Sequence, residues 1–238
     1  MSQNIIKHIH RVNALKDLAT KLGVMPVIHA LQTWQCDRLL VSHDDLAQQK
    51  RYQKAMAFFV EELYGPKDFS QRDADLARVI PKLAKVLPEK AMSAMNDALS
   101  LNALSFELDM EMAQYLTQHY PGLPIDRHSY AQAYRYVRRE RDRQHQIAII
   151  SHLGDQLADV IKIRGIGMLI SISRRPAKVA GVLALHEFLA RGFDAFKAIG
   201  DVQSFIQPVL QRETQMMMAL LSDTLVLPED NPLPEVHQ

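Results

Sequence analysis

The chain has 238 residues, of which 47% are hydrophobic and 23% are charged, so it can bury a substantial core without disulfides or metal. Its formal net charge of +1 excludes a global attraction to nucleic acid or anionic lipid, and such a partner would need a local patch. An aromatic content of only 7%, with 11 methionines, favours helices over β-sandwiches and barrels.

Three features of the sequence bear on the cellular compartment. Cys36 is the only cysteine in the sequence, which excludes an intramolecular disulfide and a paired-cysteine metal or redox site. Residues 1–22 mix apolar and charged residues and lack the apolar stretch of a signal peptide. No segment reaches the roughly 18 uninterrupted apolar residues of a spanning helix. The sequence therefore predicts a cytoplasmic protein with no membrane partner.

Apolar residues three and four positions apart predict a succession of amphipathic helices. In chain order we expect them over residues 4–22, 26–39, 42–63, 70–86, 89–118, 126–164, 173–199 and 201–227. Gly23 and Gly200 lie where C-terminal caps are expected, and Asp126 lies where it can cap a helix start. Ser42 and Asp45 resemble a capping box.

The expected helix over residues 89–118 is apolar on nearly all sides, which places it at the centre of the fold. No flexible linker divides the chain. We therefore predict one all-α domain, residues 1–227, built as a bundle of seven or eight helices and similar in size and helix number to heme-oxygenase-like proteins. Residues 228–238 contain three prolines and acidic residues with almost nothing to bury, which predicts a disordered tail.

One motif supports a family resemblance. The run is Phe58-Phe59-Val60-Glu61-Glu62-Leu63-Tyr64-Gly65-Pro66, followed by Lys67-Asp68-Phe69. It resembles the signature of a bacterial family called FFLEELY-motif proteins, with Val60 where the family name has Leu. The resemblance implies an uncharacterised bacterial protein and transfers no catalytic residue. Glu61, Glu62 and Tyr64 are taken as binding candidates, although core aromatics beside solvated acids would also explain the motif.

A metal site is one alternative, because helical bundles hold di-iron and di-manganese centres. The candidate ligands are His145, His152, His186, Glu107 and Glu111. Glu107 and Glu111 are one helical turn apart, and both His145 and His152 lie three residues from an aspartate. No ligand pair repeats on a second helix, so no cofactor is predicted, and iron or manganese is the alternative.

Asp109 lies on a stripe of apolar residues, where a buried carboxylate needs a partner or a raised pKa. Arg138, Arg143 or a histidine could serve as that partner. A structural polar network and a catalytic acid both fit this pattern.

Residues 127–145 carry six arginines interleaved with Tyr130, Tyr134 and Tyr136. Arginine with aromatics is what phosphate contact and base stacking need, so Tyr134 and Arg138 are binding candidates. A solvated, ion-paired helix is the structural alternative, and nucleic acid is not favoured. Arg174, Arg175 and Lys178 form a second, smaller basic cluster.

The preferred functional hypothesis is a binding or interaction protein that holds a small apolar ligand or a protein partner between its helices, in one version as a homodimer. One alternative is an oxidoreductase, either heme-oxygenase-like or with a di-metal carboxylate centre. The other is nucleic-acid binding through the basic helix at residues 127–143.

Overall fold

The computed structural model describes residues 2–58, 70–85, 87–222 and 233–236. Within these ranges all regular secondary structure is helical, which confirms the all-α prediction, and there are eleven helices. The predicted count of seven or eight was wrong. Three of the expected helices are each divided in two, and the resemblance to heme-oxygenase-like architecture stays a prediction.

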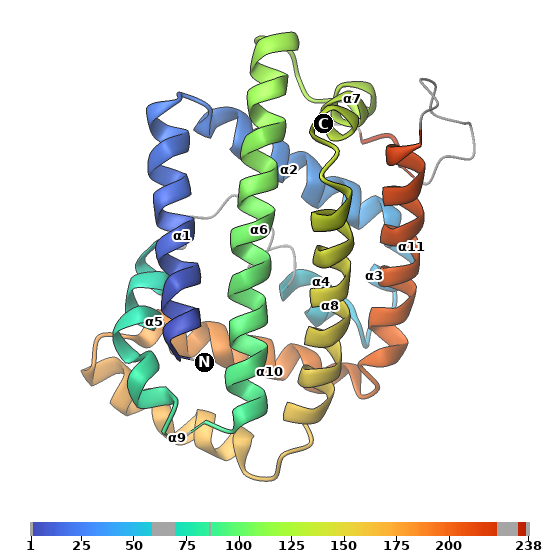
Figure 1. Ribbon diagram of the computed structural model, residues 1–238. Helices are drawn as coiled ribbons and strands as arrows, with labels where there is room; N and C mark the ends of the chain where they lie inside the picture. Colours follow the sequence, from blue (N-terminus) through green and yellow to red (C-terminus); the bar gives the residue numbers. More distant parts are fainter. Residues whose placement is uncertain (1, 59–69, 86, 223–232, 237–238) are drawn as a thin grey trace.

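Four long helices stand side by side and form one layer of the molecule (Figure 1). They are α1 (Ser2–Lys21), α6 (Glu89–His119), α8 (Glu140–Val160) and α11 (Gln203–Leu221). Helix α6 packs against α1, α2, α7 and α8, and it buries twelve of its side chains. Its central position follows from the apolar residues on nearly all of its sides, as predicted.

The remaining helices lie behind this layer and at its two ends (Figure 1). They are α2 (Met25–Ser42), α3 (Asp44–Ala47), α4 (Gln53–Phe58), α5 (Ser70–Leu83), α7 (Arg127–Val137), α9 (Ile166–Val179) and α10 (Leu183–Ile199). Helix α10 packs against α4, α5 and α9. Helices α7 and α9 lie at opposite ends of the upright helices.

Several helix ends follow the predicted signals. The Asp126 side chain accepts a hydrogen bond of 2.7 Å from the Ser129 backbone N–H. In return, the Ser129 hydroxyl accepts a hydrogen bond of 3.0 Å from the Asp126 backbone N–H. This reciprocal box starts α7. Gly23 and Gly200 follow α1 and α10 with φ angles of +70° and +78°, which glycine adopts without a steric penalty.

The expected single helix over residues 126–164 is instead two helices, α7 and α8. Arg138 and Arg139 have φ angles of +55° and +40°, so the backbone leaves the right-handed helical region for two residues. The corner turns the chain from α7, at the end of the molecule, into the upright α8. Arg139 holds it by pairing with Glu107, Glu111 and Asp142.

Two further expected helices are also divided. The segment predicted over 173–199 breaks at Gly181, whose φ of +68° lies between α9 and α10, and α9 starts earlier, after Gly165. The segment predicted over 42–63 is divided at residues 48–52, which lie between the short helices α3 and α4, and Ser42 at its start belongs to α2. Residues 59–63 of that prediction lie outside the described residues.

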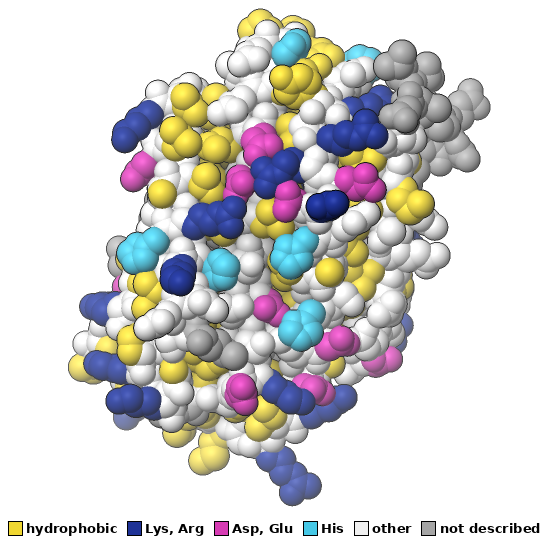
Figure 2. All heavy atoms as spheres, in the orientation of Figure 1, with side chains coloured by type: hydrophobic (Ala, Val, Ile, Leu, Met, Phe, Trp, Pro, Cys, Tyr) yellow, Lys and Arg dark blue, Asp and Glu magenta, His cyan; other side chains and the backbone are white. Residues whose placement is uncertain are grey.

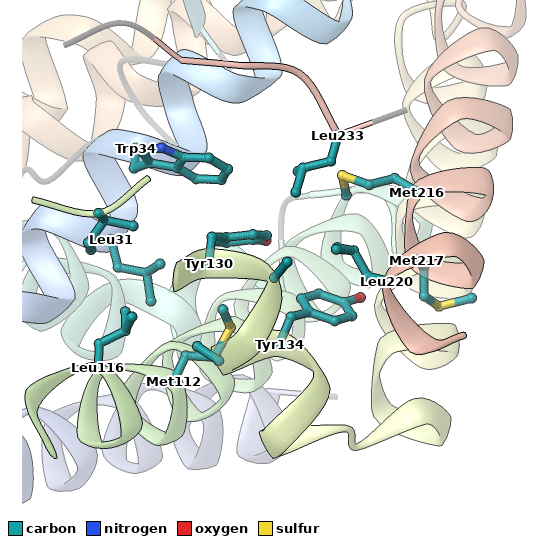
Figure 3. Packing of buried hydrophobic residues seen from close by; sticks show 13 residues of the cluster. Leu31, Trp34, Met112, Leu116, Tyr130, Tyr134, Met216, Met217, Leu220 and Leu233 are labelled. Carbon is teal, nitrogen blue, oxygen red and sulfur yellow. The ribbon is translucent and has the colours of Figure 1, made fainter. Parts of the chain in front are cut away.

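One of the hydrophobic clusters joins α2, α6, α7 and α11 (Figure 3). The Trp34 and Tyr130 rings stack in it with centroids 4.3 Å apart. Leu233 is fully buried in the same cluster, although it lies in the segment predicted as a tail. The proposed domain boundary at residue 227 stays a prediction. None of the described helices combines the length and apolar character that crossing a bilayer demands.

Candidate functional site

A cavity of about 780 Å³ lies between the helices. Its volume falls within the range of about 300–1,000 Å³ that is typical of small-molecule sites. Most lining side chains are apolar, among them Leu99, Phe106, Leu153 and Phe196. Residues of both α7 and α9 line the cavity, so it extends toward both ends of the upright helices (Figure 1). The shape and chemistry suit an elongated apolar molecule.

Polar side chains gather where α2, α6, α7, α8 and α11 meet the cavity. We call Gln35, Arg38, Asp109, Tyr130, Tyr134, Arg143 and Glu213 the buried polar cluster. Asp109 comes from the central helix α6, and the Gln35 amide donates a hydrogen bond of 3.0 Å to it. Gln32, one turn earlier on α2, donates a second bond of 3.3 Å. Helix α2 therefore positions both amides on the same carboxyl group.

Asp109 is buried, and this burial raises the pKa of its carboxyl group. The hydrogen bonds from Gln35 and Gln32 and the charge of Arg143 act in the opposite direction but do not cancel the effect. A carboxyl group with a raised pKa keeps its proton closer to neutral pH than an exposed aspartate does. Asp109 can therefore act as a neutral hydrogen-bond donor in the cavity.

Arg143 is a buried cation, with only 7% of its surface exposed. No carboxylate oxygen of the described residues lies within 4.0 Å of its nitrogens. Its contacts are weak ones: Nη1 donates to the Gln146 side chain at 3.3 Å, Nη2 approaches the Met112 sulfur at 3.1 Å, and Nε has no hydrogen-bond partner. The guanidinium carbon lies 4.3 Å from the centre of the Tyr134 ring. A buried cation of this kind is well suited to bind an anion.

Arg38 and Glu213 form an ion pair of 2.5 Å in the same cluster, and His43 Nε2 lies 3.0 Å from the same Glu213 oxygen. Burial alone would raise the pKa of Glu213, but the Arg38 charge and the hydrogen bonds from His43 and Arg38 lower it to about 2. The Arg38 charge is thus balanced by an ionised Glu213, whereas the Arg143 charge has no such partner within the described part of the chain.

Tyr130 and Tyr134 complete the cluster from α7. Burial raises the pKa of both phenols, so they stay protonated and can donate hydrogen bonds at physiological pH. When Asp109 is protonated it adds no charge, and the cluster then carries the Arg38–Glu213 ion pair and the positive charge of Arg143. The cavity therefore combines apolar walls with a positive, donor-rich end.

The structure brings together only some of the predicted site residues. Asp109 and Tyr134 both belong to the buried polar cluster, and Arg143, one of the partners foreseen for Asp109, lies close enough to influence its pKa. Arg138 is at the corner between α7 and α8 and is not part of the cavity lining. The candidates Glu61, Glu62 and Tyr64 lie outside the described residues.

The candidate metal ligands do not converge. Glu107 and Glu111 bind Arg139. Acidic and basic side chains are interleaved on the face of the molecule that Figure 2 shows. His152 pairs with Asp97 at 2.6 Å, His145 is exposed, and His186 Nε2 lies 2.7 Å from the Ile170 carbonyl oxygen. No group of three or more His, Cys, Asp or Glu side chains suited to a metal ion occurs in the described ranges. Iron or manganese stays an untested alternative.

Sequence reasoning missed Gln32, Gln35 and Glu213 as members of the site. The signal on α2 was weak, because Gln32 and Gln35 alternate with the apolar residues Leu31 and Trp34 and read as ordinary surface positions. Glu213 is separated from Arg38 by 175 positions in the sequence, and only the packed fold brings the two together.

The described geometry defines an all-helical protein with an apolar cavity and a buried polar cluster. Residues 17–225 match the family model "Domain of unknown function (DUF8198)", and the chain belongs to this family. No curated protein and no solved structure matches the chain. The resemblance to the FFLEELY-motif proteins stays a prediction beside this assignment.

Proposed function

We propose that the protein binds an amphipathic anion, with the apolar chain in the cavity and a carboxylate head group against Arg143. This proposal specifies the ligand class of the apolar pocket expected from the sequence. The head group would lie at the α7 end of the cavity, where Arg143, Asp109 and the two tyrosines are found. The chain would extend toward Ile166, Leu169 and Phe193 at the α9 end, where the lining is apolar.

The observation that carries the proposal is the buried, uncompensated charge of Arg143. Burying a charge without a partner is costly, so proteins retain such a group mainly where it acts on something else. A guanidinium group matches the planar geometry of a carboxylate and binds it through parallel hydrogen bonds. The neutral Asp109 and the Tyr134 hydroxyl supply donors for the remaining oxygen lone pairs.

Replacing Arg143 with Gln is expected to weaken the binding of dodecanoate by about tenfold to a hundredfold, because a charge-assisted hydrogen bond is lost. Isothermal titration calorimetry with dodecanoate measures this directly, and dodecanol tests the contribution of the head group. Dodecanol should bind both proteins equally. The matched control is Arg164→Gln, which removes an exposed guanidinium outside the cavity lining and should leave dodecanoate affinity unchanged.

Two further variants keep this experiment decisive. Arg143→Met retains apolar volume where Gln could disturb folding, and it should also lose dodecanoate binding. Ala98→Phe adds a large side chain to the cavity wall and should reduce the binding of both dodecanoate and dodecanol. Dodecanoate binding that is equally strong in the folded Arg143→Gln and Arg143→Met proteins would show that Arg143 does not hold the head group.

The affinity for dodecanoate is expected to fall as the pH rises through the raised pKa of Asp109, because the carboxyl group then loses its proton. An ionised Asp109 would repel the head group and compete with it for Arg143. In Asp109→Asn the side chain cannot ionise, so the affinity should stay level over the same range. Calorimetric titrations at several pH values check this, and identical pH profiles for the two proteins would contradict it.

A further inference from the structure

Helix α9 turns apolar side chains toward the solvent. Met168, Ile172 and Val179 are 71%, 61% and 91% exposed, whereas Ile166 is the only residue of this helix that is buried. The three exposed residues are spaced by four and seven positions, so they lie on one face of the helix. Scattered surface apolar residues are ordinary, but these three large ones form a stripe along one helical face.

The opposite face of α9 points into the molecule. Leu169, Ile170 and Ser173 lie about a quarter to half a turn away from the exposed stripe, and all three line the cavity. Helix α9 packs against α10 on this side. Packing on the core thus explains one apolar face of the helix but not the other.

The segment of sequence that contains α9 carries charge of a single sign. Residues 160–186 contain five basic residues and no Asp or Glu: Lys162, Arg164, Arg174, Arg175 and Lys178. All five are exposed. Arg174 pairs with Glu187 of α10 at 3.2 Å. In the space-filling view, basic and hydrophobic side chains lie at the lowest edge of the molecule, the end at which α9 is found (Figures 1 and 2). The chain as a whole is nearly neutral, so this charge is local.

We propose that α9 docks the protein onto an anionic lipid bilayer, with Met168, Ile172 and Val179 entering the headgroup region. A helix that lies in the membrane interface combines one apolar face with Lys and Arg beside it, which is the arrangement observed here. Each basic side chain near an anionic surface adds a further attraction. The expectation of no membrane partner rested on the net charge of the whole chain and on the lack of a spanning segment. A surface helix of 14 residues with local basic side chains requires neither a high net charge nor a spanning length.

Charge and side-chain type favour the bilayer over the other occupants. A second copy of the chain packed symmetrically on this face would bring the basic cluster against itself, and like charges at an interface are unfavourable. Nucleic-acid sites use aromatic side chains for base stacking, whereas the exposed face of α9 carries Met, Ile and Val. An anionic bilayer satisfies both the charge and the aliphatic surface.

The docking proposal rests on exposure and charge and does not depend on the cavity ligand. The two proposals are nevertheless compatible in geometry, because docking through α9 would turn the apolar end of the cavity toward the bilayer. An amphipathic anion held head-first at the α7 end would then have its chain directed toward the membrane. Failure of dodecanoate binding would leave vesicle binding untouched, and the reverse also holds.

Vesicle sedimentation tests whether the exposed apolar side chains of α9 contribute to membrane binding. The wild-type protein should sediment with phosphatidylcholine vesicles that contain about one third phosphatidylglycerol and should stay in solution with phosphatidylcholine alone. The combined variant M168S/I172S/V179S should lose at least about tenfold in vesicle affinity, since three apolar side chains no longer enter the interface. The control L18S/L22S/L123S removes three exposed leucines elsewhere and should bind as the wild type does.

The contribution of the basic side chains is tested with R175Q/K178Q, which should bind anionic vesicles several-fold more weakly than the wild type. The control is K50Q/K54Q, which removes two exposed positive charges elsewhere. Binding should also weaken as salt increases. Equal binding of neutral and anionic vesicles, or no difference between the α9 variants and their controls, would overturn the proposal. So would an α9-dependent dimer, or retention of RNA in place of vesicles.

Discussion

Glu213→Gln is expected to lower the free energy of unfolding by about 3 kcal/mol or more at pH 7, because it removes the carboxylate of a buried ion pair. The Arg38 side chain is only 6% exposed and Glu213 only 16%, so neither charge is well solvated. An amide can still accept hydrogen bonds from Arg38 and His43 but does not balance the Arg38 charge. Urea unfolding followed by circular dichroism measures the difference.

The pH dependence of this effect has a defined sign. The pKa of Glu213 in the folded protein is lowered to about 2, below the value of about 4.3 for an unfolded glutamate. The stabilisation is therefore fully present above the unfolded pKa and is lost as the pH falls from there toward about 2. The gap in stability between wild type and Glu213→Gln should accordingly narrow between pH 5 and pH 3 or so.

Glu187→Gln is the matched control, because its ion pair with Arg174 lies at the surface with both side chains about half exposed or more. Exposed pairs contribute about 0–1 kcal/mol, so this variant should unfold close to the wild type. If Glu213→Gln and Glu187→Gln lost equal stability, the buried pair would not hold the cluster together. Arg38 would then have to be stabilised by its other contacts.

Helical periodicity predicted the fold class and the central helix because both depend on local patterns. The start of α7 at Asp126 and the end of α1 at Gly23 were read correctly for the same reason, since each cap needs only a few adjacent residues. The break at Gly181 had an available signal, a glycine inside an apolar stripe. The corner at Arg138 and Arg139 had none, because arginine has no preference for positive φ and the corner depends on acids from α6.

The candidate site was predictable only in part. Asp109 stood out because an acid on an apolar stripe requires an explanation, and the structure shows that it is buried, while its role as a site residue stays a prediction. Its partners could not be identified, since Gln35 reaches it across 74 positions of sequence. The solvent exposure of one apolar face of α9 was likewise not predictable, because an amphipathic pattern does not show which of two apolar faces packs against the core. Tertiary packing decides these features.

Trp34→Ala is expected to destabilise the protein by about 3–5 kcal/mol, the range for a large aromatic removed from a core. Trp34 is fully buried on α2 and stacks on Tyr130 of α7 (Figure 3). Removing the ring therefore opens a cavity where two helices meet beside the buried polar cluster. Val41→Ala on the same helix is the control, because Val41 is half exposed and should lose little.

Trp34→Phe separates ring packing from hydrogen bonding. No described group accepts a hydrogen bond from the indole Nε1–H, so its removal breaks no such interaction. The phenyl ring can still lie over Tyr130 and should limit the loss to about 2 kcal/mol. Circular dichroism in urea compares all three variants. A loss in Trp34→Phe as large as in Trp34→Ala would mean that the indole nitrogen has an acceptor in the protein, and Tyr130 stacking would not be the main contribution of this residue.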